Sequence, residues 1–322
     1  MHCMCIRSLL ECSGPQVMQG ASSVPSSAAI RISSSPLRQQ TRSAGNMRSS
    51  AGVKCRSLRP TTLPYGVLSS CSARSRTALL PPGSSGPRST ARAVDLSSDL
   101  RPGHTALKVP YGLTETARDT LRGAEVIANP GCYPTAILLA LVPLLERRLV
   151  RAGSTIVADA ASGVTGAGNS PKPELLFGEV TGNYRAYGAG NEHRHLPEMR
   201  AFVDGYSVDA DLLFTPHLLP VARGILATIT VQLTNELNEP LSVWEEHFAE
   251  EPFVEVSPHL PQLRDVTHRN VVRISVRKAK NMRVPTLIVM SAIDNLVKGA
   301  AGQAIQNANV SFGFAEGSGL PR

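Results

Sequence analysis

A sharp change in composition near residue 93 limits which part of this 322-residue chain can build a hydrophobic core. Residues 1–93 contain a single acidic residue, Glu11, against twelve lysines and arginines, and they are rich in serine, proline and glycine. Such a segment buries too little apolar surface to offset the entropy of ordering it, so we expect residues 1–93 to be disordered. The fold and its chemistry are therefore expected in residues 94–322.

The sequence leaves three interpretations of this leader open. An Arg- and Ser-rich, acid-poor leader is typical of an organelle transit peptide. The same mixture also arises when a GC-rich gene is read out of phase. A basic nucleic-acid-binding tail is the least favoured, because no aromatic residues are interleaved with the basic ones. We expect a cytoplasmic protein if the source is prokaryotic, and a plastid or mitochondrial one if the leader is a transit peptide.

The charge and the cysteines divide at the same place. The formal net charge of +8 is +11 in residues 1–93 and −3 in the rest, so the basic balance is no argument for nucleic-acid binding by the folded part. Cys132 is the single cysteine after the leader, which excludes a disulfide framework there. No apolar run reaches the ~18 residues that a membrane span needs, and we expect neither nucleic acid nor membrane as a partner.

Cys132 stands in a turn, residues 129–135, between two apolar stretches. Residues 126–128 are typical of a strand end, and apolar side chains at helical spacing in residues 136–145 predict a helix with one buried stripe. Cys132 is therefore expected near a helix N-terminus, where free N–H groups and the positive end of the dipole favour a thiolate. This is a good position for a nucleophile, although a lone cysteine is more often a small buried apolar residue.

Two further stretches are rich in groups that can do chemistry. Residues 159–169 contain three glycines and two hydroxyl side chains, which indicates a loop whose N–H groups can face an anion or a flat ring. Residues 183–198 include His193 and His195, which point different ways in a loop and need not share a role. His-x-His alone is an incomplete set of ligands, so no metal site is predicted. With Cys132 elsewhere in the chain, a Cys/His pair for acyl transfer is the sharper hypothesis.

The rest of the chain alternates between strand and helix patterns. Period-two alternation in residues 224–233 and 272–277 predicts half-buried strands of a largely antiparallel sheet. Residues 154–158 and 286–293 are expected to be strands too, and residues 241–248 a helix. Near residue 94 we expect a strand end capped by a turn, then a short helix from a Thr114 cap to Arg122.

Several stretches of the chain together resemble the N-acetyl-gamma-glutamyl-phosphate reductase family, which is related in design to aspartate-semialdehyde dehydrogenase. The resemblance covers about residues 94–322, and several motifs in the family's order make it specific. The stretches that carry it are residues 94–101, 111–115, 129–135, 162–168, 185–188, 193–198, 215–217, 223–224 and 294–307.

The resemblance implies an α/β fold: the remnant of a Rossmann-type NADP-binding domain, and an inserted α+β catalytic and dimerisation domain with a mixed, largely antiparallel sheet. The nucleotide-binding remnant would be residues 94–131, the inserted domain residues 132–294, and residues 295–322 a helix returning to the first domain. The family reduces N-acetyl-L-glutamyl 5-phosphate to the 5-semialdehyde with NADPH, in arginine biosynthesis. A homo-oligomer, dimer or tetramer, is expected.

Roles carried over from the family rest on the resemblance alone. Cys132 would be the nucleophile and His195 the acid/base, with His193 as the alternative for the proton. Substrate would be bound or supported by Asn129, Arg185, His193, Glu198, His217 and Arg223. The cofactor NADP(H) would lie near Ser162, Gly163, Asn295 and Lys298.

One departure from the family concerns the cofactor. The family opens with a strand, a Gly-rich turn and a helix that hold the dinucleotide phosphates, and residues 1–93 contain no such turn. The alternatives are therefore a related acyl-phosphate semialdehyde dehydrogenase, acting on an aspartyl or aminoadipyl substrate, or a truncated, non-catalytic remnant that only dimerises. A cofactor-free thiol hydrolase is a weaker alternative.

Overall fold

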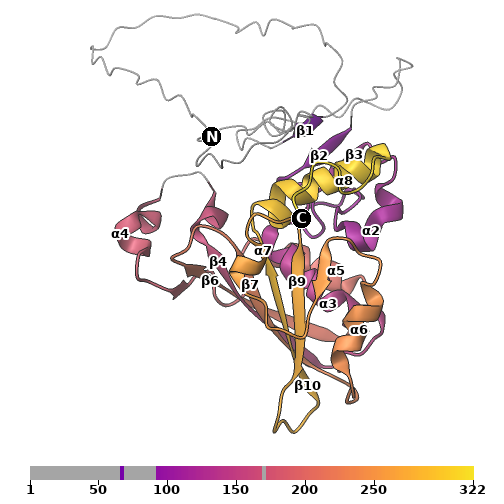
Figure 1. Cartoon of the computed structure of the whole chain (residues 1–322). Helices are drawn as coiled ribbons and strands as arrows, with labels where there is room; N and C mark the ends of the chain where they lie inside the picture. The colour runs from indigo at the N-terminus through magenta and orange to yellow at the C-terminus, as the bar shows by residue number, and fades with distance from the viewer. Residues whose placement is uncertain (1–65, 69–91, 169–171) are drawn as a thin grey trace, which may run out of the picture. The chain divides into compact units, whose positions relative to one another are not determined.

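Two β-sheets of different kinds organise the computed structural model, which describes residues 66–68, 92–168 and 172–322 (Figure 1). The expected disorder of residues 1–93 therefore lies almost entirely outside the described residues. One sheet has three parallel strands, in the order β1 (Gly66–Leu68), β2 (Ala93–Asp95) and β3 (Val126–Ala128). Short parallel strands of this kind belong to α/β architecture, in which helices cover the sheet. The described part of the nucleotide-binding remnant is thus a small parallel sheet, and its domain limits stay a prediction.

The second sheet has seven strands in the order β5-β6-β4-β7-β10-β9-β8. Its neighbours are antiparallel except for β4–β6 and β8–β9, so the expected mixed, largely antiparallel sheet is confirmed. In β7 the apolar side chains at every second position are buried, as the alternation predicted. The strands are β4 (Ser154–Gly163), β5 (Arg185–Ala186), β6 (Ala210–Leu219), β7 (Ile225–Gln232), β8 (Val254–Val256), β9 (Val272–Lys278) and β10 (Thr286–Ile293).

Helix α3 (Cys132–Glu146) forms the centre of the core. It packs on strands β7, β9 and β10, and on α5 (Leu196–Asp204) and α6 (Pro240–His247). Every side chain from Tyr133 to Leu145 is buried, so the prediction of a single buried stripe was wrong. The helix has no solvent face because the sheet, two helices and the turn before α8 surround it.

Helix α8 (Gly302–Phe312) packs against β2 and α2 (Thr114–Leu121), beside the small sheet (Figure 1). It follows a single π-helical turn, η4 (Val297–Ala301), which contacts α3. The short helix after Thr114 is confirmed, but Thr114 does not cap it. The cap position is Leu113, and the Thr114 hydroxyl donates instead to Asn307 Oδ1 on α8 at 2.7 Å.

The Gly-rich stretch at residues 159–169 is less of a loop than we expected. Strand β4 runs on to Gly163, because residues 159–163 pair with β6 and residues 157–162 also pair with β7. A short 3-10 helix, η2 (Val164–Ala167), follows. The remaining short elements are η3 (Pro173–Leu175), α4 (Phe177–Val180) and α7 (Leu263–Val266).

The turn after β2 forms as the sequence predicted. Asp95 accepts hydrogen bonds from the N–H and the hydroxyl of Ser97, at 3.0 and 2.7 Å. In the part of the chain that the structure describes, no helix is both long and apolar enough to cross a lipid bilayer.

Candidate active site

Cys132 is the first residue of α3, so the strand–turn–helix position predicted for it is confirmed. The turn that precedes it is held by two hydrogen bonds to the C-terminal segment. Asn129 Nδ2 donates to the carbonyl of Ala300 at 3.3 Å, and Asn129 Oδ1 accepts from Asn307 at 2.9 Å. A Cβ placed on Gly299 would lie only 2.8 Å from Cys132 Cβ, so the turn before α8 touches the cysteine.

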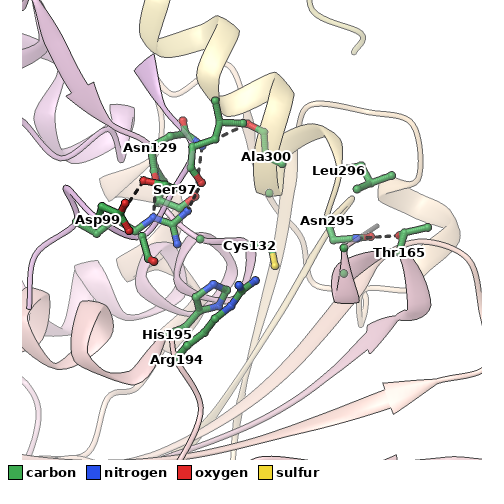
Figure 2. Close-up of a pocket in the computed structure, with 18 residues that line it drawn as sticks. Ser97, Asp99, Asn129, Cys132, Thr165, Arg194, His195, Asn295, Leu296 and Ala300 are labelled. Carbon is green, nitrogen blue, oxygen red and sulfur yellow. Dashed lines mark hydrogen bonds between the residues drawn. The ribbon is translucent and has the colours of Figure 1, made fainter. Parts of the chain in front are cut away.

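Cys132 lines a cavity of about 410 Å³ (Figure 2). The segment after β2, the cysteine turn and the turn after β10 contribute to its wall. The segments that form the cavity meet where β2 and β3 end, which is where ligands bind in parallel α/β sheets. Besides Cys132, the cavity is lined by Leu96, Ser97, Ser98, Asp99, Arg101, Asn129, Pro130, Gly131, Thr165, Gly166, Gly168, Arg194, His195, Asn295, Leu296, Gly299 and Ala300.

His195 faces the same cavity from the N-cap position of α5. Its ring packs so closely on the cysteine turn that a Cβ on Gly131 would lie 2.6 Å from His195 Nε2. Burial, together with the charge of Arg101, lowers the pKa of His195 well below its ordinary value. His195 is therefore neutral at pH 7. Its Nδ1 has no hydrogen-bond partner among the described residues.

His193 lies in a different cavity, of about 420 Å³, on the far side of Gly166 and Arg194. The two rings stay close, with centroids 4.9 Å apart, and His193 Nδ1 accepts the His195 backbone N–H at 3.2 Å. Burial lowers the pKa of His193 to about 4, so it too is neutral at pH 7. The second cavity also receives Arg185, Ser162 and Gly163.

Glu198 is fully buried beneath the cysteine turn. Its Oε1 accepts hydrogen bonds from the Gly131 N–H at 2.8 Å and the Tyr111 hydroxyl at 2.7 Å, and its Oε2 pairs with Arg101 at 3.2 Å. Arg101 also donates to the carbonyls of Asn129 and Leu96. The carboxylate thus supports the turn that carries Cys132, and it lines neither cavity.

Asn295 lines the first cavity and joins three segments. Its Oδ1 accepts the Gly224 N–H at 2.7 Å and its Nδ2 donates to the Thr165 hydroxyl at 3.0 Å (Figure 2). Arg223 lies next to this junction, where its Nη1 is 3.3 Å from the buried carboxylate of Asp294. The structure therefore gives Arg223 a partner within the chain and places it in neither cavity.

Lys298 and His217 also lie away from both cavities. The fully buried Lys298 ammonium donates to Glu115 Oε1 at 2.5 Å and to Gln306 Oε1 at 2.8 Å, so it links η4 to α2 and α8. His217 stacks on Tyr184, with ring centroids 5.2 Å apart. Of the site residues predicted from sequence, the first cavity brings together Cys132, His195, Asn129 and Asn295, and the second Arg185, His193, Ser162 and Gly163.

The expectation of a thiolate at Cys132 was wrong for the free protein. Burial raises the pKa of the Cys132 thiol, and this exceeds the lowering by the Tyr133 N–H and by the charges of Arg101 and Arg194. The helix N-terminus is present, but desolvation of the sulfur outweighs it. A neutral thiol and a neutral imidazole therefore share the cavity at pH 7.

The residues that line the first cavity without a role predicted from the sequence include Ser97, Asp99, Arg101, Thr165 and Arg194. The first three lie in the family-like stretch 94–101, and Arg194 stands between the two histidines. These residues thus lie inside stretches that resemble the family, although no role was predicted for them. Their side chains reach the cavity only through contacts between segments that are far apart in sequence.

The contact between Gly131 and His195 allows a direct test of geometry. The φ angle of Gly131 is −70°, which alanine adopts freely, so Gly131→Ala acts only through its new methyl group. We expect this methyl to displace the His195 ring and to lower kcat by about 100-fold, while overpacking against the buried ring lowers the free energy of unfolding by about 1–3 kcal/mol.

The matched control is Gly178→Ala, because nothing lies within 4 Å of a Cβ at that position. Steady-state rates and denaturant unfolding of both variants give the comparison. Equal rates for the two variants would show that the position of the His195 ring has no effect on turnover.

The raised pKa of the Cys132 thiol predicts a pH profile. Only the thiolate is alkylated, so the rate of reaction with iodoacetamide should still increase above pH 8.5, the ordinary cysteine pKa, in the free protein. The rate at Cys132 is measured by mass spectrometry of its peptide. A plateau below pH 7 would instead show a thiolate paired with a protonated histidine.

The profile of the family described as "Semialdehyde dehydrogenase, dimerisation domain" matches residues 132–295. Curated relatives cover more of the chain. The N-acetyl-gamma-glutamyl-phosphate reductase of Geobacter metallireducens is 42% identical over 251 residues, 71% of this chain and 71% of the relative. The protein of that name from Cellvibrio japonicus is 43% identical over 253 residues, 71% of this chain and 72% of the relative.

Solved structures show the same fold. Aspartate semialdehyde dehydrogenase II from Vibrio cholerae superposes with a TM-score of 0.53 at 20% identity, over 69% of this chain and 72% of that one. A probable aspartate-semialdehyde dehydrogenase from Pseudomonas aeruginosa gives a TM-score of 0.54 at 18% identity, over 68% and 72% of the two chains. At this level of identity the likeness concerns the fold alone.

Proposed function

The chain belongs to the N-acetyl-gamma-glutamyl-phosphate reductase family, and from this premise we propose that the cavity at Cys132 reduces N-acetyl-L-glutamyl 5-phosphate to the 5-semialdehyde and phosphate. One observation carries the proposal. A half-buried cysteine at a helix N-terminus shares a cavity with a buried neutral histidine, beside the carboxyl ends of two parallel strands. Thiol and imidazole are the two groups that acyl transfer from a phosphate requires.

In the first step Cys132 Sγ attacks the acyl carbon. The carbon–sulfur bond forms, the carbon–oxygen bond to the phosphate breaks, and its electron pair leaves with the phosphate, which gives a thioester on Cys132. His195 is neutral and lines the same cavity, so it can accept the thiol proton as the sulfur attacks. Glu198 holds the Gly131 N–H and so keeps the cysteine turn in place during the reaction.

The second half of the reaction needs a nicotinamide cofactor, which the family implies. When bound, it supplies the hydride that reduces the acyl group. His195 would give the proton that it took from the thiol to the substrate oxygen, and would take it back as the carbon–sulfur bond breaks and the thiolate of Cys132 is released.

The residues present fit the nicotinamide end of such a cofactor. The first cavity passes from Ser97 and Ser98, after β2, to Thr165 and Asn295, and it reaches Cys132. Polar groups at the carboxyl ends of parallel strands are where dinucleotides bind in such sheets. We propose that the cofactor is NADP(H), held by these residues. Lys298 would act from outside the cavity, through the turn that it anchors.

The matched family is described as a dimerisation domain, so the chain belongs to an oligomer-forming group. This supports the proposal that it acts as a homo-oligomer through residues 132–295. The seven-stranded sheet and α3 fall in this range.

Titration of the purified full chain with NADPH, followed by cofactor fluorescence, tests the proposal together with a turnover assay on N-acetyl-L-glutamyl 5-phosphate. Micromolar binding and NADPH-dependent release of the semialdehyde are expected. Absence of binding at millimolar NADPH would overturn the reductase function of this chain. Turnover of aspartyl phosphate in preference to the N-acetylglutamyl compound would overturn the substrate.

A further inference from the structure

Two residues, Arg194 and Gly166, line both cavities. Arg194 stands between His193, in the second cavity, and His195, in the first. Its side chain runs beside that of His195 toward Cys132 (Figure 2). The guanidinium therefore lies where a ligand that extends from the nucleophile into the second cavity would pass.

The charge of Arg194 is not neutralised within the described part of the chain. The first cavity is lined by two arginines, Arg101 and Arg194. Arg101 is committed to Glu198 and to two backbone carbonyls. Arg194 is exposed, and it makes no hydrogen bond or ion pair with another described residue. An arginine that lines a cavity with no partner presents its whole fork of N–H donors to a ligand.

The field of Arg194 acts on the reacting groups. Its charge opposes the desolvation that raises the pKa of the Cys132 thiol, and it lowers the pKa values of both histidines. A positive charge at this place also attracts an anionic ligand next to the sulfur. The Cys132 thiol is neutral in the free protein, so it does not neutralise the Arg194 charge.

We propose that Arg194 holds the phosphoryl group of the acyl phosphate beside Cys132, an assignment that rests on the proposed function. As Sγ bonds to the acyl carbon, the carbon–oxygen bond breaks and its electron pair goes to the departing phosphate. A guanidinium fork binds two phosphoryl oxygens at once and stabilises the charge that develops there. Arg194 is then a catalytic residue, and the second cavity takes the leaving side of the substrate.

The test uses alkylation of Cys132 in the full chain, which needs no cofactor. Iodoacetate is an anion and iodoacetamide is neutral, so their rate ratio reports the charge beside the sulfur. Because the chain contains five other cysteines, at positions 3, 5, 12, 55 and 71, the reaction is followed at the Cys132 peptide by mass spectrometry. Inorganic phosphate, added as a ligand, should protect Cys132 from iodoacetamide.

The variant is Arg194→Gln, and the matched control is Arg200→Gln, an arginine on α5 that lies 3.4 Å from Asp211 and lines neither cavity. We expect Arg194→Gln to lower the iodoacetate-to-iodoacetamide ratio about fivefold, the loss of one partly screened charge near the sulfur. The phosphate concentration for half-protection should increase about tenfold, as expected for a lost charge-assisted contact. Arg194→Lys, which keeps the charge without the fork, should recover the rate ratio more fully than the protection. Arg200→Gln should change neither quantity.

Unchanged phosphate protection in Arg194→Gln would overturn the proposal. A second ligand, N-acetyl-L-glutamate, gives another contradicting outcome. If Arg194→Gln loses the protection of Cys132 by N-acetyl-L-glutamate but keeps the protection by phosphate, the guanidinium holds a substrate carboxylate and not the phosphoryl group. These outcomes are independent of the reductase assay. A chain that shows Arg194-dependent phosphate protection but no NADPH turnover would keep the phosphate site and lose the proposed function.

Discussion

Replacing Cys132 with serine should lower the NADPH-dependent reductase rate by roughly 10³-fold or more, because a serine hydroxyl is a far weaker nucleophile than a thiolate. His195 is neutral and can accept a proton, but loss of its proton to a histidine does not make a serine hydroxyl as reactive as a thiolate. The rate is measured by the loss of NADPH absorbance with N-acetyl-L-glutamyl 5-phosphate.

The fold should survive the substitution. Cys132 is half-buried as a residue and serine is slightly smaller, so we expect the free energy of unfolding to change by less than about 1 kcal/mol. NADPH affinity should be retained. Cys71→Ser, at one of the cysteines outside the described residues, is the control and should keep full activity. A Cys132→Ser rate within tenfold of the native rate would remove Cys132 from the mechanism.

Removal of the Glu198 carboxylate should have the largest effect on stability. Glu198→Ala leaves Arg101 buried without its counter-charge and leaves the Gly131 N–H and the Tyr111 hydroxyl without an acceptor. Breaking one side of a buried ion pair typically costs about 3–5 kcal/mol. We therefore expect a loss of this size in the free energy of unfolding, measured by denaturant titration, together with loss of activity.

A double variant separates the two effects of Glu198. In Arg101→Met/Glu198→Leu neither charge is left unpaired, and buried pairs replaced by apolar residues often recover stability. This variant should be more stable than Glu198→Ala but remain inactive, because the cysteine turn has lost its carboxylate support. If Glu198→Ala unfolds like the native chain, the carboxylate is not the support that its contacts indicate.

The local sequence pattern was enough to predict the strands and the position of the cysteine. The buried face of β7 follows from strict alternation, and the strand, Gly131 and apolar run around Cys132 define a turn into a helix from neighbouring residues alone. The same local pattern misjudged the burial of α3. One buried stripe was expected, yet the helix is enclosed on all sides. The spacing of apolar residues along a helix does not determine how many other elements pack on it.

The groups around the nucleophile depend on contacts between distant residues. Glu198 reaches Gly131 across 67 positions and Arg101 across 97, and Lys298 reaches Glu115 across 183. Two histidines one residue apart fall into two cavities because the chain turns between them. From its sequence alone this protein could be recognised as a chain with a cysteine at a helix N-terminus and a family-like order of motifs. Only the tertiary structure decided that the thiol is neutral, that Lys298 is buried in an ion pair, and that Arg194 lacks a partner among the described residues, because burial and charge pairing are set by segments that meet only after folding.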